Sequence, residues 1–352
     1  MRIAVVSTPF LSTPPRDYGG TELVVSELVE GLAARGHAVK LFATGDSHTT
    51  AELRALYARP QWPPDPLTDV NHVSWALHQA AESRVDLVHV NSAAALAVGG
   101  LCPKVPLVYT LHHPHDPGLS AFYGQFPGVH YVAISDDQRS RETGLARCRV
   151  IHHGVDPSRY ELSEHPADYV CFVGRLAPEK GPHTAIDAAA CAGVPIRVAG
   201  QVHSQDRAFA ERELTGRVNA AHVRYLGPIG MAQKVSLLRD ARALLAPITW
   251  DEPFGLILIE AMLCGCPVVA FPRGSVPELV EQGTTGIIVE SLEEMAAAIV
   301  PGGAVDGICR RRCRAHARQR FSRARLVADH ERLYADVLAS RDLSVRSPIA
   351  AA

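Results

Sequence analysis

The chain has 352 residues, of which 47% are hydrophobic, and it carries a formal net charge of −2 at pH 7. This length allows about two domains, and this share of apolar residues supports a sizeable core and excludes a disordered chain. The near-neutral charge gives no general attraction to nucleic acid or to anionic lipid.

The cysteines and the N-terminus point to a reducing compartment. The eight cysteines are scattered, with close pairs only at Cys264/Cys266 and Cys309/Cys313. Neither pair has a matching second half, so we expect no disulfide framework and no structural zinc site. The opening MRIAVVSTPF is too short and too soon polar for a signal peptide, and no uncharged apolar run approaches the roughly 20 residues that span a bilayer. We therefore expect a soluble, cytoplasmic protein.

Short apolar runs alternate with helical patterns in both halves of the chain. In the first half the expected strands are 2–7, 39–43, 86–90, 107–111 and 131–135, with 149–152 as a sixth candidate, and the clearest helix is 21–35. In the second half the expected strands are 169–173, 195–199, 223–226, 243–247, 267–271 and 286–289, and the helices are 182–192, 232–239 and 253–263. Strands that are apolar throughout are typical of parallel sheets covered on both faces. The pattern predicts an α/β protein with two doubly wound, Rossmann-like domains.

Polar and proline-containing segments divide this pattern. The segment Pro157–Pro166 marks the expected join, which gives an N-terminal domain at 1–160, a C-terminal domain at 161–325, and a final segment at 326–352 whose last residues, Ser347–Ala352, are expected to be frayed. The segment Pro60–Pro66, with Trp62 inside it, is expected to be a loop. A solvated helix face explains most of the eight arginines of 308–325, and anchoring on acidic lipid is the alternative.

The segment 249–271, TWDEPFGLILIEAMLCGCPVVAF, carries the strongest chemical signal. Pro253 suits the first position of a helix, and Gly255 lets a ligand approach the backbone. The free N–H groups of such a helix start attract phosphate. Glu252 and Glu260 cannot bind phosphate but can accept hydrogen bonds from hydroxyl groups. A nucleotide-activated sugar combines both features.

Two further motifs follow predicted strands, where open parallel sheets bind ligands. Arg175 and Lys180 in GRLAPEKG place two cations beside a helix start, which suits a diphosphate, although a solvated loop is the alternative. Gly19-Gly20 precede the first long helix and either admit a phosphate or sugar or merely shape the turn. No G-x-G-x-x-G follows the first strand and no G-x-x-x-x-G-K-[ST] occurs, which counts against dinucleotide dehydrogenases and P-loop enzymes.

Histidines follow two of the predicted strands. His112-His113-Pro114-His115-Asp116 resembles a metal-binding run, but Pro114 breaks the spacing and the sequence nominates no further ligand. We therefore expect one histidine of this run to line a cleft and to bond a sugar hydroxyl. His152-His153 is expected to pack at a hinge rather than to take part in catalysis.

With these residues assembled, the chain resembles the retaining glycosyltransferases of family GT4, which have the GT-B architecture. The resemblance rests on YGGTELVVSELVEGLAARGHAVKLF, PLVYTLHH, AISD, HHGVDPSRY, VGRLAPEKG, YLGPI and EPFGLILIEAMLCGCPVVA, between residues 18 and 289. It implies two Rossmann-like domains facing each other across a cleft, with a final helix that crosses back to the first domain. His152-His153 depart from the Pro-Asn that the family usually has before Gly-Val-Asp, which leaves the detail of the hinge loop open.

The resemblance also implies a role for each matching residue. Arg175 and Lys180 would hold the donor diphosphate, with Glu252 at the hydroxyls of the transferred sugar and Glu260 at the ribose. The remaining contacts with the donor would come from the backbone of Phe254, Gly255 and Leu256, from His112 at the sugar, from Gly19 and Gly20 at the phosphate, and from Leu226 near the nucleobase.

The expected reaction is transfer of a hexose, glucose or mannose, from a nucleoside diphosphate sugar to an acceptor hydroxyl. Family members retain the anomeric configuration, and the leaving phosphate is thought to take the acceptor's proton. A covalent intermediate on Glu252 is the less favoured route.

Because two side-chain cations and a helix end serve the leaving group, we expect no metal and no cofactor; the nucleotide sugar is a co-substrate. A non-catalytic nucleotide-sugar binder and a sugar-nucleotide epimerase are the alternatives. The expected partners are the donor and a hydroxyl acceptor, without nucleic acid, and peripheral membrane contact is disfavoured.

Overall fold

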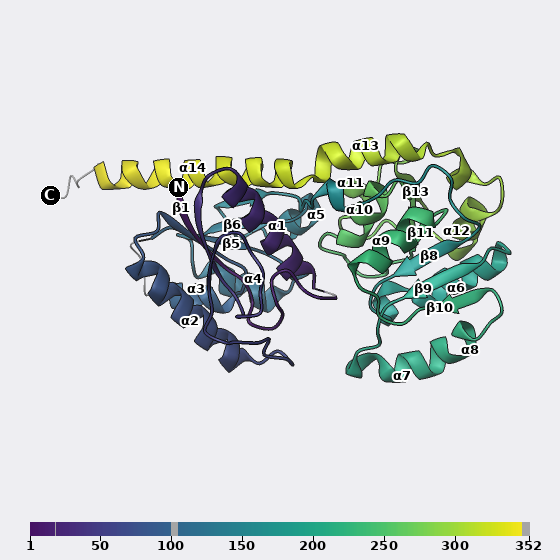
Figure 1. The fold of residues 1–352 in the computed structure, drawn as a ribbon, viewed down its shortest axis with the longest axis horizontal. Helices are drawn as coiled ribbons and strands as arrows, with labels where there is room; N and C mark the ends of the chain where they lie inside the picture. The colour runs from purple at the N-terminus through teal and green to yellow at the C-terminus, as the bar shows by residue number, and fades with distance from the viewer. Residues whose placement is uncertain (18, 100–104, 347–352) are drawn as a thin grey trace. The chain divides into compact units, whose positions relative to one another are not determined.

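The computed structural model describes residues 1–17, 19–99 and 105–346 of the chain (Figure 1). It contains two compact units: unit 1 is Met1–Val155 together with Arg323–Ala352, and unit 2 is Asp156–Ser322. The domain limits expected at 1–160, 161–325 and 326–352 stay a prediction beside this division. Tyr18 of the glycine motif and the frayed end expected at Ser347–Ala352 lie outside the described residues.

Unit 1 is built on a parallel sheet of seven strands in the described part of the chain. The strands are β1 (Arg2–Val6), β2 (Ala38–Phe42), β3 (Glu52–Arg54), β4 (Leu87–Val90), β5 (Leu107–Thr110), β6 (His130–Ala133) and β7 (Cys148–Val150). Their order is β3-β2-β1-β4-β5-β6-β7, so the direction of winding reverses between β1 and β4. Ile3, for example, lies opposite Val39 on one side and Leu87 on the other.

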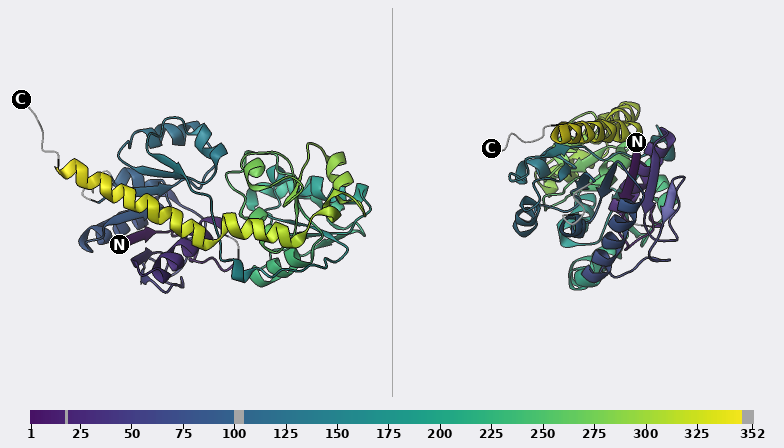
Figure 2. Two further views of the ribbon diagram at one scale, coloured as in Figure 1. Left: turned by 90° about the horizontal axis from the view of Figure 1, so that it is seen from above. Right: turned by 90° about the vertical axis from the view of Figure 1, so that its left-hand side faces the viewer.

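The helices of unit 1 cover this sheet. They are α1 (Gly20–Ala34), α2 (Pro66–Glu82), α3 (Ala94–Gly99), α4 (Pro117–Gly124), α5 (Asp136–Arg141) and α14 (Arg323–Arg346). The last of these, yellow in Figure 2, packs on α1. A Cβ on Gly31 would lie 2.3 Å from Cγ2 of Val327, so glycine allows the close approach. Arg323 of α14 forms an ion pair with buried Glu27 of α1.

Among the elements of unit 1 that were not expected, α2 and β3 show why the sequence signal was missing. The helix α2 was not predicted, because the proline-rich segment before it hides a helix start: the Asp65 carboxylate accepts a hydrogen bond from Thr68 N at 2.8 Å, and Pro66 opens the helix. Thus Pro66 belongs to the helix rather than to the loop. The strand β3 has three residues and no apolar run, so its sequence carries no strand signal.

Unit 2 repeats the architecture with a parallel sheet of six strands among the residues described. The strands are β8 (Val170–Val173), β9 (Ile196–Ala199), β10 (Val223–Tyr225), β11 (Leu244–Ala246), β12 (Val268–Ala270) and β13 (Gly286–Ile288). Their order is β10-β9-β8-β11-β12-β13, so the winding reverses between β8 and β11. Such a reversal opens a crevice at the carboxyl ends of the two central strands, where ligands bind in this architecture.

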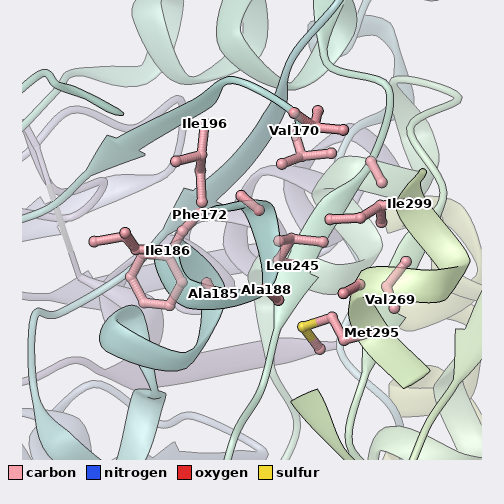
Figure 3. Close-up of a cluster of buried hydrophobic side chains, with 14 of the residues drawn as sticks. Val170, Phe172, Ala185, Ile186, Ala188, Ile196, Leu245, Val269, Met295 and Ile299 are labelled. Carbon is pink, nitrogen blue, oxygen red and sulfur yellow. The ribbon is translucent and has the colours of Figure 1, made fainter. Parts of the chain in front are cut away.

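The main helices of unit 2 are α6 (Pro182–Cys191), α9 (Met231–Asp240), α10 (Leu256–Leu263), α12 (Leu292–Ile299) and α13 (Arg310–Phe321). Shorter helical segments are η1 (Pro157–Arg159), η2 (Pro178–Lys180), η3 (Ser204–Asp206), α7 (Arg207–Phe209), η4 (Ala210–Leu214), α8 (Thr215–Val218), α11 (Val276–Leu279) and η5 (Ala304–Gly307). One buried cluster joins the sheet to α6 and α12, and Figure 3 shows Phe172 and Leu245 of the strands beside Ile186 and Met295 of these helices. Burial of each large side chain stabilises the unit by about 1.5–3 kcal/mol.

The arginine-rich segment does more than present a solvated face. Arg310 is buried and donates hydrogen bonds to Ala241 O at 2.8 Å and to Arg239 O at 2.6 Å, at the end of α9. Arg314 donates to Leu263 O, at the end of α10. Both guanidinium groups therefore bind carbonyl oxygens at the C-terminal ends of α9 and α10. Carbonyls at helix ends have no partner within the helix, and positive charge is favoured there. These two arginines are therefore not part of the solvated helix face that was expected for most of the segment.

The described chain contains no helix that is long and apolar enough to cross a membrane. The seven cysteines with described positions are free thiols.

Candidate functional site

In unit 2, the loops that follow β8 and β11 meet at the point where the winding reverses. Gly181 ends η2 with φ of 71°, and a Cβ there would lie 2.3 Å from Pro247 O. Thr249 N donates a hydrogen bond to Glu179 O at 2.9 Å. Glycine is therefore required at 181 both for its backbone conformation and for close contact between the loops. This contact brings the GRLAPEKG and TWDEPFG segments together.

The ion pair between Lys180 and Glu252 lies where these two loops meet. Lys180 Nζ binds Glu252 Oε2, and the same oxygen accepts a hydrogen bond from Trp250 Nε1 at 2.9 Å. Lys180 Nζ also lies 4.7 Å from the centre of the Trp250 ring, a cation–π contact. The side chains of Lys180 and Glu252 are 18% and 11% exposed, so both can still be reached from solvent.

Arg175 occupies the start of the same loop. Its guanidinium donates to Asp206 Oδ2 at 3.0 Å and to Glu179. The two cations expected at this edge of the sheet are present, but each is paired with a carboxylate. Asp206 was not identified from the sequence, because it lies 31 residues after Arg175 and no motif marks it.

The helix α10 begins at Leu256 rather than at Pro253, so the expected helix start is wrong by three residues. Gly255 precedes the helix with φ of 83°, a left-handed conformation that ends the loop and that a propensity argument does not reveal. Gly255 has no side chain that could cap this helix start. Phe254 O accepts a hydrogen bond from Ser275 Oγ at 2.7 Å, which fixes the loop before the helix.

Glu260 lies inside α10 and is only 2% exposed. Its Oε1 accepts hydrogen bonds from Lys234 Nζ at 2.6 Å and from Tyr160 Oη at 2.9 Å. Neither donor was expected from the sequence to be a site residue. Tyr160 lies 100 residues from Glu260 and Lys234 lies 26 residues away, and only the fold brings them together.

Leu226 directly follows β10, at the same carboxyl edge of the unit 2 sheet. Its N–H donates to Val198 O at 2.9 Å, and the neighbouring Tyr225 is 42% exposed, with its hydroxyl 3.0 Å from Gly200 O. The expected contact of this segment with a nucleobase stays a prediction.

In unit 1, Gly19 and Gly20 open α1 after the loop that follows β1. Gly19 has extended backbone with φ of 174°. A Cβ there would lie 2.8 Å from Leu11 Cδ1 and 2.9 Å from both Pro15 Cβ and Glu22 Oε2. Close packing of the loop therefore explains the need for glycine at 19, and the expected contact with a donor phosphate stays a prediction.

His112 follows β5 in unit 1 and binds Asn91, which follows β4. Asn91 Nδ2 donates to Val6 O at 3.0 Å, so its Oδ1 faces His112 Nε2 at 2.8 Å. In this arrangement Nε2 carries the proton. Burial, followed by the neighbouring His113, lowers the pKa of His112 to about 3, so the ring is neutral near pH 7. His115 of the same run binds Glu142 instead, at 3.0 Å.

A cluster of buried aromatic rings surrounds His112. Its ring stacks on His153 with centroids 5.6 Å apart, and His89 stacks on His330 of α14 at 5.4 Å. His89 Nδ1 lies 2.6 Å from the Tyr334 hydroxyl. Burial lowers the pKa of each of these histidines. These histidines also line a cavity of about 10 Å³, which is about the size of one water molecule.

Comparison with known proteins places both units in related families. Residues 18–159 match the family model described as Glycosyltransferase Family 4, and residues 159–300 match that of Glycosyl transferases group 1. A D-inositol 3-phosphate glycosyltransferase of Mycobacterium marinum is 32% identical, with 99% of this chain and 89% of that protein covered. A phosphatidyl-myo-inositol mannosyltransferase of Mycobacterium tuberculosis is 26% identical, with 86% of each chain covered.

A solved structure shares the fold. Sucrose-phosphate synthase from Thermosynechococcus elongatus has a TM-score of 0.81 and 20% identity, over 97% of this chain and 100% of that one. The two parallel α/β units, expected from the sequence as a GT-B arrangement, are confirmed.

Proposed function

Because the chain belongs to glycosyltransferase family 4, we propose that it transfers a hexose from a nucleoside diphosphate sugar to an acceptor hydroxyl, with retention of configuration and without a metal ion. The observation that carries the proposal is the meeting of Lys180, Glu252 and the start of α10 at the switch point of the unit 2 sheet.

The charge that develops during sugar transfer fits these groups. The bond between the anomeric carbon and the diphosphate breaks, so negative charge grows on the leaving phosphate while the sugar ring becomes cationic. Lys180, Arg175 and the N–H groups of α10 supply positive potential for the phosphate. Glu252 accepts hydrogen bonds from the hydroxyls of the transferred sugar.

The remaining roles follow the family resemblance. Glu260 binds the ribose, the backbone of Gly255 and Leu256 binds the phosphate and sugar ring, and Leu226 lies near the base. His112 bonds a sugar hydroxyl through its neutral ring, and Gly19 and Gly20 approach the donor phosphate. The leaving phosphate takes the proton of the acceptor hydroxyl, so the reaction needs no separate base. We place the reaction in the cytoplasm.

The acceptor class is suggested by the relatives. Both carry an inositol compound in their names, so an inositol-containing acceptor is the first to test, with GDP-mannose and UDP-glucose as the first donors. Product analysis by NMR would establish the anomeric configuration, and activity in the presence of EDTA would test independence from metal ions.

The decisive experiment replaces Lys180 and Glu252 with alanine and measures transfer at saturating donor. Removal of one preorganised group that stabilises developing charge lowers turnover by about 10²–10³. Lys40→Ala is the matched control, because Lys40 lies in unit 1 and pairs with exposed Glu52. Wild-type turnover in both site variants would refute the proposal. Conversion of the donor alone to an epimer, or binding of the donor without any turnover, would identify an epimerase or a non-catalytic binder instead.

A further inference from the structure

The two carboxylates of the unit 2 site are held in the same way. Each has one oxygen that receives two hydrogen bonds, one from a lysine and one from an aromatic side chain. For Glu252 the donors to Oε2 are Lys180 and Trp250, and for Glu260 the donors to Oε1 are Lys234 and Tyr160. The donors come from four different elements or loops, so this repetition is a property of the fold rather than of one motif.

The second oxygen of each carboxylate is left for a ligand. Among the described residues, Glu252 Oε1 and Glu260 Oε2 receive no hydrogen bond, and neither belongs to the buried side-chain atoms without a partner. Both oxygens therefore still reach solvent, although the side chains are only 11% and 3% exposed. A carboxylate oxygen has two acceptor positions, which suits a pair of neighbouring hydroxyls.

The aromatic donors are better suited than the lysines to fix orientation. Tyr160 is 1% exposed, and its backbone carbonyl is bound by Arg314, so its hydroxyl has a fixed position. The Trp250 indole carries a single N–H in the plane of a rigid ring. A lysine ammonium, in contrast, rotates on a flexible chain and supplies charge with less directional control.

We propose that Tyr160 and Trp250 are positioning residues: each turns one oxygen of its carboxylate away from the ligand and so aims the other at a hydroxyl pair. Tyr160 acts through Glu260 on the ribose of the donor, and Trp250 acts through Glu252 on the transferred sugar. The inference rests on the proposed function, since it assigns these hydroxyls to a nucleotide sugar.

The first test uses Tyr160→Phe, which removes the hydroxyl and keeps the ring. The affinities of UDP and GDP are measured by calorimetry, and the better ligand is compared with its 2′,3′-dideoxy form. We expect Tyr160→Phe to weaken the ribonucleotide about tenfold, the effect of one lost hydrogen bond, and to leave the dideoxy form unchanged. In a protein that already carries Glu260→Gln, Tyr160→Phe should lower the affinity for the ribonucleotide little further. Equal weakening of both nucleotides, or of neither, would overturn the assignment of Tyr160.

The second test uses Trp250→Phe, which removes the indole N–H and keeps an aromatic face for Lys180. We expect unchanged affinity for the free nucleoside diphosphate and about tenfold lower turnover of the sugar donor. If the affinity for the free nucleotide and the turnover of the sugar donor fell by the same factor, the role of Trp250 would be contradicted. Thermal unfolding of each variant shows whether the fold is intact.

Failure of this inference differs from failure of the proposed function. If the wild-type protein binds neither nucleotide, the proposed function fails. If it binds one of them and both variants behave as wild type, only the positioning roles fail.

Discussion

The carboxyl edges of the two sheets follow the same pattern of winding but differ in the charge of their side chains. In unit 2 the loops at the switch point carry ion pairs, such as Lys180–Glu252 and Arg175–Asp206. In unit 1 the groups beside the corresponding edge are hydrogen-bonded or stacked imidazoles with lowered pKa, such as His112 and His89. The difference shows that two sheets with related winding can carry loops of different charge, so the chemistry of each edge is set by its loops rather than by the fold.

The largest effect on the free energy of unfolding is expected at Gly181, where the two loops that carry the ion pairs of unit 2 are in contact. Gly181→Ala places a Cβ 2.3 Å from Pro247 O at a positive φ, so strain and a backbone clash act together. We expect a loss in the free energy of unfolding of more than about 3 kcal/mol, measured by denaturant titration. Gly193→Ala is the matched control, because its φ is also positive, at 66°, but no atom lies within 4 Å. It should cost only about 1–2 kcal/mol. Equal losses would show that the contact between the loops is unimportant.

The neutral edge of unit 1 should be sensitive to acid. Burial lowers the pKa of His330 to about 4. Between that value and its usual value of about 6.5, the unfolded chain binds a proton that the folded chain does not. Acidification through this window should therefore lower the free energy of unfolding by up to about 1.4 kcal/mol per pH unit for this histidine. Thermal unfolding from pH 7 to 4 measures the slope.

The matched variants for this slope are His330→Gln and His78→Gln. The first should make stability less dependent on pH, because it removes the buried titrating group. The second changes a side chain that is 70% exposed and should leave the slope unchanged. A slope that is identical in both variants would contradict the contribution of His330.

The smallest expected effect concerns the neutral hydrogen bond of His112. His112→Gln keeps a polar side chain but alters its contact with Asn91. Because a hydrogen bond between neutral groups contributes about 1 kcal/mol, turnover should fall roughly fivefold to tenfold, compared with about 10²–10³ for Lys180→Ala. Steady-state kinetics at saturating donor tests the ratio. If His112→Gln lowered turnover as much as Lys180→Ala does, the proposed difference in charge between the two edges would be contradicted.

The fold could be predicted from the sequence to a large extent because buried parallel strands have a strong local signal. Runs such as that of β1 are apolar throughout, whereas β3 at the sheet edge is not and was missed. Helix starts were less accessible, since they depend on single backbone conformations. Because Gly255 has a left-handed backbone conformation, α10 begins three residues after Pro253. Asp65 caps the start of α2 within a segment whose sequence resembles a loop.

The site was only partly accessible from the sequence. Lys180 and Glu252 were identified because each belongs to a compact motif, and the structure brings the two into contact. Their assigned roles, like those of the other site residues, stay predictions. Tyr160 and Lys234 were missed, because their importance comes only from contact with Glu260 across the fold. Local patterns mark residues within one loop, whereas partners supplied by distant elements require the three-dimensional arrangement.

The contacts of the α13 arginines limit how strongly this helix can bind polyanions. Arg310 and Arg314 bind carbonyl oxygens at the ends of neighbouring helices, whereas Arg311, Arg312 and Arg318 are exposed. Retention on a heparin column should therefore be weaker than the clustered arginines suggest. A lysine could not replace Arg310, since a single ammonium nitrogen cannot span the three carbonyls that one guanidinium joins.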